Sequence, residues 1–416
     1  MLNHYYGSSQ AMEGMRSGCV GPHLDGFVEA MAAAGYTPNT IREYVRTTVH
    51  LGRWADRHGI ALSTFDEEVL QRFRKHLSSC RCTVQSLGVF SHALSNARHF
   101  LAYLVKQLVI VQATPSAPAP VVPAIAERFA SWMIRHRGVV SGTAVGYQLR
   151  LQPFLEKLGD DPGKYDPEGI RQFVIDHLTK KGREEARTVV TAIRAFLRFL
   201  VAEGSVRSGI EYCVPTVPRW RLSSLPRFLE APDVERVVNS CNLSTRHGRR
   251  DQAILLLLAR LGLRAGDIFQ MKLEDIDWNR GTLRVRGKGR RDVLLPLPQD
   301  VGDAVAAYLM HGRPKSIHDT VFLCANAPPR PFSTSSSVSD VVRLALKRAG
   351  IRNPPSRGAH LLRHSAATAM LRGGSSLDSI ATVMRHRSTD TTAYYAKVDV
   401  NLLLRVAQPW PGGASC

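Results

Sequence analysis

Cysteines, acidic side chains and long apolar runs are all scarce in this chain of 416 residues. The seven cysteines are an odd number, scattered between Cys19 and Cys416, which argues against the disulfide framework of a small secreted domain and predicts free thiols. The most apolar run, Ala253–Ala259, is cut by Arg260, whereas a bilayer span needs about 20 residues. Because the N-terminus also lacks a basic segment followed by an apolar stretch, we expect a soluble cytoplasmic protein.

Patterns for binding a metal or a nucleotide are also weak or missing. Cys80 and Cys82 are the only close pair of cysteines, and without a second pair or ligand-spaced histidines they are weak evidence for zinc. No carboxylates cluster at metal-binding spacing, and no glycine-rich phosphate loop precedes a Lys-Ser/Thr pair. We therefore expect neither a metal nor a nucleotide cofactor.

Positive charge, in contrast, is abundant. Lys and Arg number 55 against 35 Asp and Glu, which gives a formal net charge of +20. An excess of this size is most simply explained by a polyanionic partner, with nucleic acid first, although a merely soluble basic surface is the alternative. The 44% of hydrophobic residues is typical of a folded globular chain.

Two proline-containing stretches divide the sequence. The segment Ala113–Pro120 is rich in proline and alanine, and Cys213–Pro226 places further prolines among basic residues. Because proline fixes φ and cannot donate a backbone hydrogen bond, both stretches are typical of linkers. They predict three domains, at residues 1–112, 121–212 and 225–416.

The first two regions resemble each other. Arg98–Val105 recurs with similar residue types as Arg194–Val201, and Thr40–Tyr44 has the spacing of Thr143–Tyr147. Duplication of a helical unit of roughly a hundred residues would explain this. The alternative is that amphipathic helices at the end of small domains converge on such patterns. Both interpretations predict helical units with apolar and basic positions interleaved.

The third region is mixed. Arg249–Leu261 has the pattern of a helix ended by Gly262. Gly281–Leu297 alternates apolar and polar residues on both sides of Gly287–Gly289, which predicts a β-hairpin. Further helices are predicted at Ser336–Ala349, Ala359–Arg372, Leu377–Met384 and Leu402–Ala407.

Several polar residues of this region stand at suggestive positions. Arg264 follows a helix end, Lys288 stands between two glycines at the hairpin tip, and His360 and Arg363 share a helix face at a spacing of three. His386 precedes the pair Tyr394-Tyr395. Taken singly, each has an ordinary structural explanation, such as a helix cap, a solvated turn or a core aromatic.

Taken together, these residues closely resemble the tyrosine recombinase (phage-integrase) family, in which Arg, Lys, His-x-x-Arg, His and Tyr occur in this order. Leu261–Arg264, Val285–Gly289 and His360–Thr368 are similar to its motifs almost residue for residue. The resemblance covers about residues 225–407. One departure is Met384-Arg385, where the family usually has Leu-Gly before the histidine.

The resemblance implies a mostly helical fold with a small β-hairpin or sheet. Two N-terminal helical (SAM-like) DNA-binding units, an arm-binding and a core-binding domain, would precede a mixed α+β catalytic domain. The implied activity is site-specific recombination of double-stranded DNA, in which strands are cleaved and rejoined through a 3′-phosphotyrosine intermediate. The energy of the broken bond stays in that linkage, so the reaction needs no external source.

The chemistry suggests a role for each residue. Arg264 and Arg363 would clamp the non-bridging oxygens of the phosphate, since arginine is permanently charged and matches phosphate geometry. His386 would add a third hydrogen bond. The family's nucleophile follows this histidine by nine residues, which assigns Tyr395.

Proton transfers need two more groups. A tyrosine hydroxyl with a pKa of about 10 needs help to attack, and His360 is the expected base. Lys288 would act as the acid that protonates the leaving 5′ oxygen. Asp267 is expected to orient Arg264.

Strand exchange between two duplexes implies four protomers on DNA, as a homo-tetramer or a mixed tetramer with related recombinases. The apolar segment Leu402–Ala407 could then dock on a neighbouring protomer or on its own domain. Two other functions remain open. One is a type IB topoisomerase, which reseals the same strand, and the other is a non-catalytic DNA-binding accessory protein.

Overall fold

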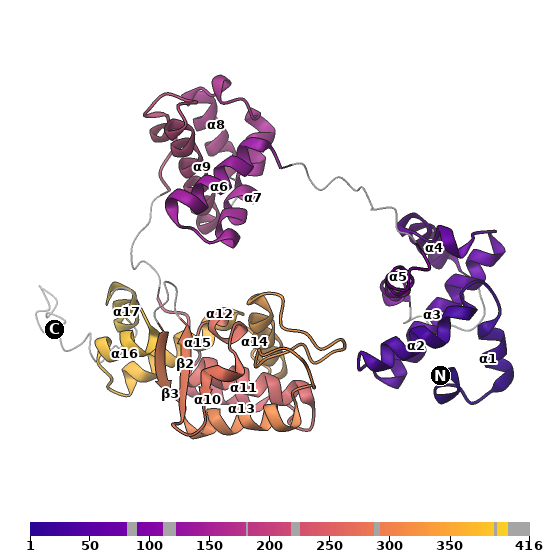
Figure 1. Cartoon of the computed structure of the whole chain (residues 1–416). Helices are drawn as coiled ribbons and strands as arrows, with labels where there is room; N and C mark the ends of the chain where they lie inside the picture. Colours follow the sequence, from indigo (N-terminus) through magenta and orange to yellow (C-terminus); the bar gives the residue numbers. More distant parts are fainter. Residues whose placement is uncertain are drawn as a thin grey trace, which may run out of the picture. The chain divides into compact units, whose positions relative to one another are not determined.

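The computed structural model describes residues 1–80, 90–110, 122–179, 182–217, 225–286, 292–386 and 389–397. Helices dominate, and the strands form one small sheet (Figure 1). Residues 114–223 form a compact unit of their own. Separate hydrophobic cores lie before, within and after this unit. None of the helices in these ranges is both long and apolar enough to cross a bilayer.

The N-terminal part is a group of helices around an aromatic core. Its α-helices are α1 (Ser9–Arg16), α2 (Leu24–Ala33), α3 (Pro38–Arg57), α4 (Glu67–Ser79) and α5 (Phe90–Lys106). Helix α3 begins where the Thr37 side chain accepts the Thr40 N–H, with Pro38 in the first turn. Its apolar side, from Ile41 to Trp54, is buried and packs against α5.

The middle unit is also helical. It contains α6 (Ala124–Arg137), α7 (Ser141–Leu158), α8 (Pro167–Leu178) and α9 (Arg183–Ala202). Asp166 caps α8 by accepting the Gly169 N–H, and α6 ends at Gly138, whose φ is 61°. Fully buried phenylalanines, among them Phe154 and Phe196, fill the space between the helices.

The two helical parts share an element order, as the sequence repeat suggested. In each, two helices are followed by a short 3-10 turn and two more helices, so α2 to α5 correspond to α6 to α9. Phe27 meets Phe100 edge to face at 5.1 Å, and Phe129 meets Phe196 at 5.5 Å in the corresponding places. The predicted helical units are confirmed, and their origin by duplication stays an interpretation.

The C-terminal part combines helices with an antiparallel sheet of order β1-β2-β3. Its central helix, α11, carries the apolar run Ala253–Ala259 and packs against α13, α14 and α15. The elements are α10 (Ala231–Asn239), α11 (Arg246–Arg260), α12 (Ala265–Phe269), β1 (Ile276–Asp277), β2 (Thr282–Arg286), β3 (Asp292–Pro296), α13 (Gln299–His311), α14 (Ser336–Arg348), α15 (Ala359–Arg372), α16 (Leu377–Met384) and α17 (Thr389–Ala396).

The predicted fold class, mostly helical with a small sheet, is confirmed. Helices α15 and α16 have the predicted bounds, and β2 pairs with β3 as the predicted hairpin. The hairpin tip at Gly287–Gly289 and the predicted helix Leu402–Ala407 lie outside the described residues. The three domain boundaries stay a prediction.

Candidate active site

Arg264 is positioned by a tight turn at the end of α11. Gly262 has a φ of 58°, and a Cβ atom there would lie 2.5 Å from Sδ of Met384. The left-handed backbone therefore favours glycine, and any larger residue would also have to displace the end of the Met384 side chain. Arg264 then caps α12, and its backbone N–H donates to Oδ2 of Asp267 at 2.7 Å.

Two guanidinium groups converge on the turn after α16. Arg363, on α15, is only 4% exposed and donates to the carbonyl oxygens of Gly262 and Met384. Nη2 of Arg264 donates to the carbonyl oxygen of Arg385 at 2.8 Å. Burial and the neighbouring charge of Arg264 lower the pKa of Arg363 to about 10, so this side chain stays protonated at neutral pH.

Arg385 occupies the position where the sequence departs from the family pattern. Its φ of 51° and ψ of 50° are left-handed, a conformation that glycine adopts without strain. Its guanidinium forms a buried ion pair with Asp267. Among the described residues, Nε and Nη1 of Arg385 have no hydrogen-bond acceptor. Asp267 thus holds the Arg264 backbone and the Arg385 side chain.

Tyr395, on α17, is almost completely buried beside this turn. Its hydroxyl lies 2.7 Å from Nδ1 of His364, and its ring stacks on His386 with centroids 6.1 Å apart. Tyr395 is 2% exposed, and this burial raises the pKa of its hydroxyl to about 12, against the opposing effect of Arg363. In this state the hydroxyl is protonated.

Three histidines, His360, His364 and His386, lie around Tyr395 and the two arginines, and all three are neutral at pH 7. The pKa of His364 is lowered to about 4, mostly by burial and to a smaller extent by the nearby His360 and Arg363. The pKa of His386 is also lowered to about 4, mostly by burial and to a smaller extent by Arg363 and Arg264. Nδ1 of His386 lies 2.8 Å from Oγ1 of Thr392. The His360 side chain is exposed. Its pKa is lowered as well, first by partial desolvation and then by the positive charges of Arg363 and Arg264.

Tyr394 is directed elsewhere. Its hydroxyl donates to the carbonyl oxygen of Leu225 at 2.6 Å. Its ring stands edge-on to that of Tyr395, with an angle of 69° between the ring planes. The two adjacent hydroxyls therefore have different partners, and it is Tyr395 whose hydroxyl lies among the histidines.

The structure brings together most residues proposed from the sequence. Arg264, Arg363, His386 and Tyr395 surround one turn, with His360 on the same helix as Arg363. Lys288 lies outside the described residues.

His364 was not predicted from the sequence as a partner of Tyr395. Its signal was present, since it follows His360 by four residues and so shares a helix face with it.

The strained backbone of Arg385 generates a testable prediction. Replacing Arg385 by alanine or by glycine removes the ion pair with Asp267 in both cases, but only glycine adopts the left-handed conformation without strain. We expect Arg385→Gly to be more stable than Arg385→Ala by about 1 kcal/mol. Denaturant unfolding of the two variants measures this difference. An alanine variant as stable as the glycine variant would show that the turn relaxes without cost.

Comparisons with known proteins agree on one family. Residues 227–401 match the model of the phage integrase family. A putative integrase/recombinase of Sinorhizobium fredii, y4rA, is 35% identical over 99% of this chain and 100% of its own length. The tyrosine recombinase XerD of Listeria monocytogenes is 28% identical over 65% of this chain and 93% of its own.

Solved structures share the fold. XerH bound to a palindromic difH substrate matches with a TM-score of 0.53 and 18% identity, over 81% of this chain and 93% of that chain. A lambda integrase tetramer bound to a Holliday junction also has a TM-score of 0.53, with 17% identity, over 65% of this chain and 76% of that chain. With a relative above 30% identity along nearly its whole length, this chain belongs to the tyrosine recombinase (phage integrase) family.

Proposed function

We propose that this protein is a site-specific DNA recombinase that cleaves and rejoins strands through a 3′-phosphotyrosine at Tyr395. The observation that carries the proposal is the position of the Tyr395 hydroxyl, hydrogen-bonded to His364 within a cluster that includes Arg363. A nucleophile beside fixed cations is the arrangement that phosphoryl transfer requires.

The cations account for stabilisation of the transition state. Attack on a phosphodiester produces a pentacoordinate phosphorus whose equatorial oxygens carry increasing negative charge. Arg264 and Arg363 would donate to these oxygens, since their backbone contacts fix them at the same turn. His386, whose ring lies against Tyr395, would supply a further hydrogen bond.

Tyr395 has to be activated before it can attack, because in this structure its hydroxyl is buried and protonated. A hydroxyl with a pKa of about 12 is a poor nucleophile at neutral pH, so DNA binding has to bring a base or more positive field to it. His360 is the proposed base, because it is exposed where a substrate can reach it. His364 then holds the resting hydroxyl, and Lys288 is the proposed acid for the leaving oxygen.

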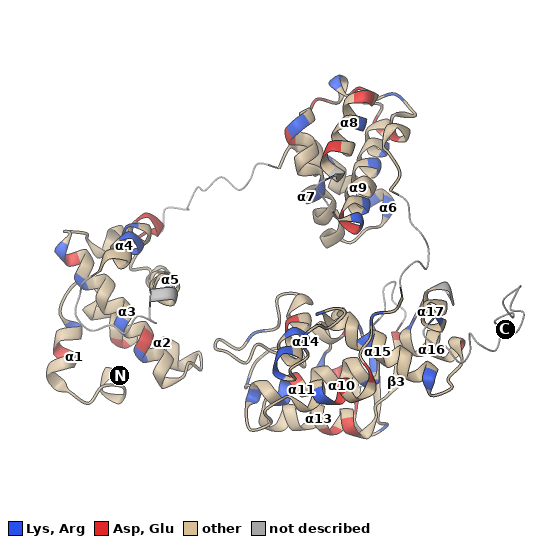
Figure 2. Cartoon of the chain, turned by 180° about the vertical axis from the view of Figure 1, so that it is seen from behind, with Lys and Arg blue, Asp and Glu red and all other residues tan. Residues whose placement is uncertain are grey.

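The two N-terminal helical parts are proposed as arm-binding and core-binding domains, at residues 1–112 and 121–212, before the catalytic domain at 225–416. Lys and Arg occur on the helices of all three parts (Figure 2). Together these Lys and Arg side chains would neutralise many phosphates, so the affinity for double-stranded DNA should fall steeply as the salt concentration rises.

Assembly is proposed to involve four protomers on DNA, because two duplexes contain four strands to be exchanged. The lambda integrase matched above was solved as a tetramer on a Holliday junction, which supports the proposal by analogy. A topoisomerase or an accessory protein is less favoured, since the full-length relative is named as an integrase/recombinase and none of Arg264, Arg363 and Tyr395 is missing.

The nucleophile can be identified with a nicked DNA substrate that traps the covalent intermediate. We expect Tyr395→Phe to abolish covalent attachment and to leave DNA binding nearly intact, because it removes one oxygen atom. Tyr394→Phe is the matched control and should retain cleavage, since its hydroxyl contacts Leu225. Gel analysis of trapped complexes measures both variants. Attachment that survives in Tyr395→Phe and is lost in Tyr394→Phe would reverse the assignment.

The two histidines on α15 can be separated by substitution with asparagine. The asparagine oxygen can accept a hydrogen bond near the position of Nδ1, but asparagine cannot take up a proton at neutral pH. We expect His360→Asn to slow single-turnover cleavage by at least about 10²-fold, as for loss of a general base. His364→Asn should stay within a few-fold of the wild type. A large loss with His364→Asn alone would make His364 the base.

A further inference from the structure

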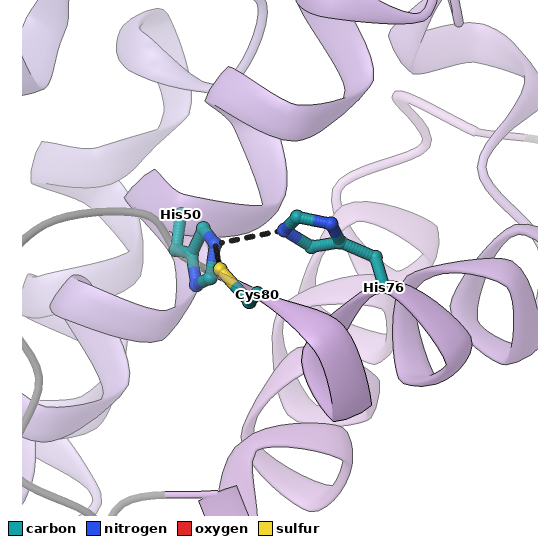
Figure 3. Close-up of side chains that lie close together, drawn as sticks. All are labelled: His50, His76 and Cys80. Atoms are coloured by element: carbon teal, nitrogen blue, oxygen red, sulfur yellow. Dashed lines mark hydrogen bonds between the residues drawn. The ribbon is translucent and has the colours of Figure 1, made fainter.

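A cluster of two histidines and a cysteine lies in the N-terminal part, on helices that carry none of the candidate active-site residues. His50 comes from the middle of α3, His76 from the last turn of α4, and Cys80 from the residue that ends α4 (Figure 3). Nε2 of His50 lies 3.3 Å from Nε2 of His76 and 3.5 Å from Sγ of Cys80. All three candidate ligand atoms lie within 4.8 Å of one another.

These distances match the edges of a tetrahedral zinc site. With Zn–N of about 2.05 Å and Zn–S of about 2.3 Å, tetrahedral angles place two nitrogens about 3.3 Å apart and a nitrogen and a sulfur about 3.6 Å apart. The two distances from Nε2 of His50, to Nε2 of His76 and to Sγ of Cys80, already have about these lengths. The third distance, between the ligand atoms of His76 and Cys80, is at most 4.8 Å.

The local structure explains why these side chains point to one place. His76 and Cys80 are four residues apart, so they lie on the same side of one helical turn. The His50 ring packs edge-on to Phe73 with centroids 5.3 Å apart, and the His76 ring stacks on Trp54. Aromatic packing therefore orients both imidazoles before any ligand arrives.

The ring atoms that face one another are of the kind that binds metal. Nε2 of each histidine is turned toward the other, and neutral imidazole binds metal through such a nitrogen. A competing explanation is a purely hydrogen-bonded trio, in which the imidazole protons are shared among Nε2 and Sγ atoms.

We propose that His50, His76 and Cys80 bind one Zn²⁺ ion, or a similar borderline-soft divalent cation. Two imidazoles and a thiolate are ligands that zinc prefers, and the fourth position would hold water or another donor. Cys82 lies outside the described residues and is not part of the proposed site. The ion would link the middle of α3 to the end of α4, stabilising the N-terminal part and leaving the chemistry at Tyr395 unchanged.

Cobalt(II) substitution tests this site directly in the full-length protein. The reduced protein, freed of metal with a chelator, is titrated with Co²⁺ and then with Zn²⁺. We expect one equivalent of Co²⁺ to bind with a thiolate charge-transfer band in the near ultraviolet and visible bands of tetrahedral intensity. Zn²⁺ should then displace it and raise the thermal unfolding temperature.

Variants assign the ligands. Cys80→Ser should lose the charge-transfer band, and His50→Asn and His76→Asn should each weaken Co²⁺ binding by at least about 10-fold, the effect of losing even a supporting group. Cys19→Ser and His92→Asn are matched controls in the same part of the chain and should bind like the wild type. Circular dichroism confirms that each variant is folded. Because three single variants are compared, misfolding of one leaves the other two to test the site.

Two results would overturn the proposal. One is a wild-type protein that binds no stoichiometric Co²⁺ or Zn²⁺, which would leave the trio as hydrogen-bonded only. The other is a charge-transfer band that persists in Cys80→Ser, which would place the metal at other cysteines. Neither result depends on recombination activity, so failure of this proposal is distinguishable from failure of the proposed function.

Discussion

The catalytic part is organised by positive charge gathered at one backbone turn. Arg363 is nearly buried, and its guanidinium donates to carbonyl oxygens of Gly262 and Met384 instead of to a carboxylate. Arg264 and Arg385 meet at the same turn, and Asp267 pairs with Arg385. Burying a charge costs several kcal/mol, which the carbonyl dipoles and the nearby Asp267 offset only partly for Arg363. A DNA phosphate bound as proposed would add negative charge at this turn, so binding of substrate and completion of the site would coincide.

The same burial restrains the nucleophile. Tyr395 is enclosed by His364 and His386, and desolvation keeps its hydroxyl protonated. A protonated tyrosine hydroxyl is a weak nucleophile. In the proposed mechanism the phosphate and the histidines have to come together before attack, which would couple reactivity to DNA binding. Helix α16 ends at the left-handed Arg385, directly before His386, whose ring stacks on Tyr395.

Local signals in the sequence predicted much of this structure. Helices α15 and α16 have the bounds predicted from the sequence, and β2 and β3 form the hairpin predicted from the alternation of apolar and polar residues. The arginines and Tyr395 were found through motif order. Contacts between distant segments could not be predicted in this way. The bond from His364 to Tyr395 depends on how α15 packs against α17, and the ion pair of Arg385 spans 118 residues.

Arg264 and Arg363 are proposed to act by neutralising charge on the scissile phosphate. The most direct test is to replace that phosphate by an uncharged methylphosphonate and to measure single-turnover cleavage by wild type, Arg264→Ala and Arg363→Ala. We expect each alanine variant to be severely slowed on phosphate and to regain activity relative to the wild type on methylphosphonate, where there is no charge to neutralise. Variants equally impaired on both substrates would contradict it, since the arginines would then act only by shaping the site.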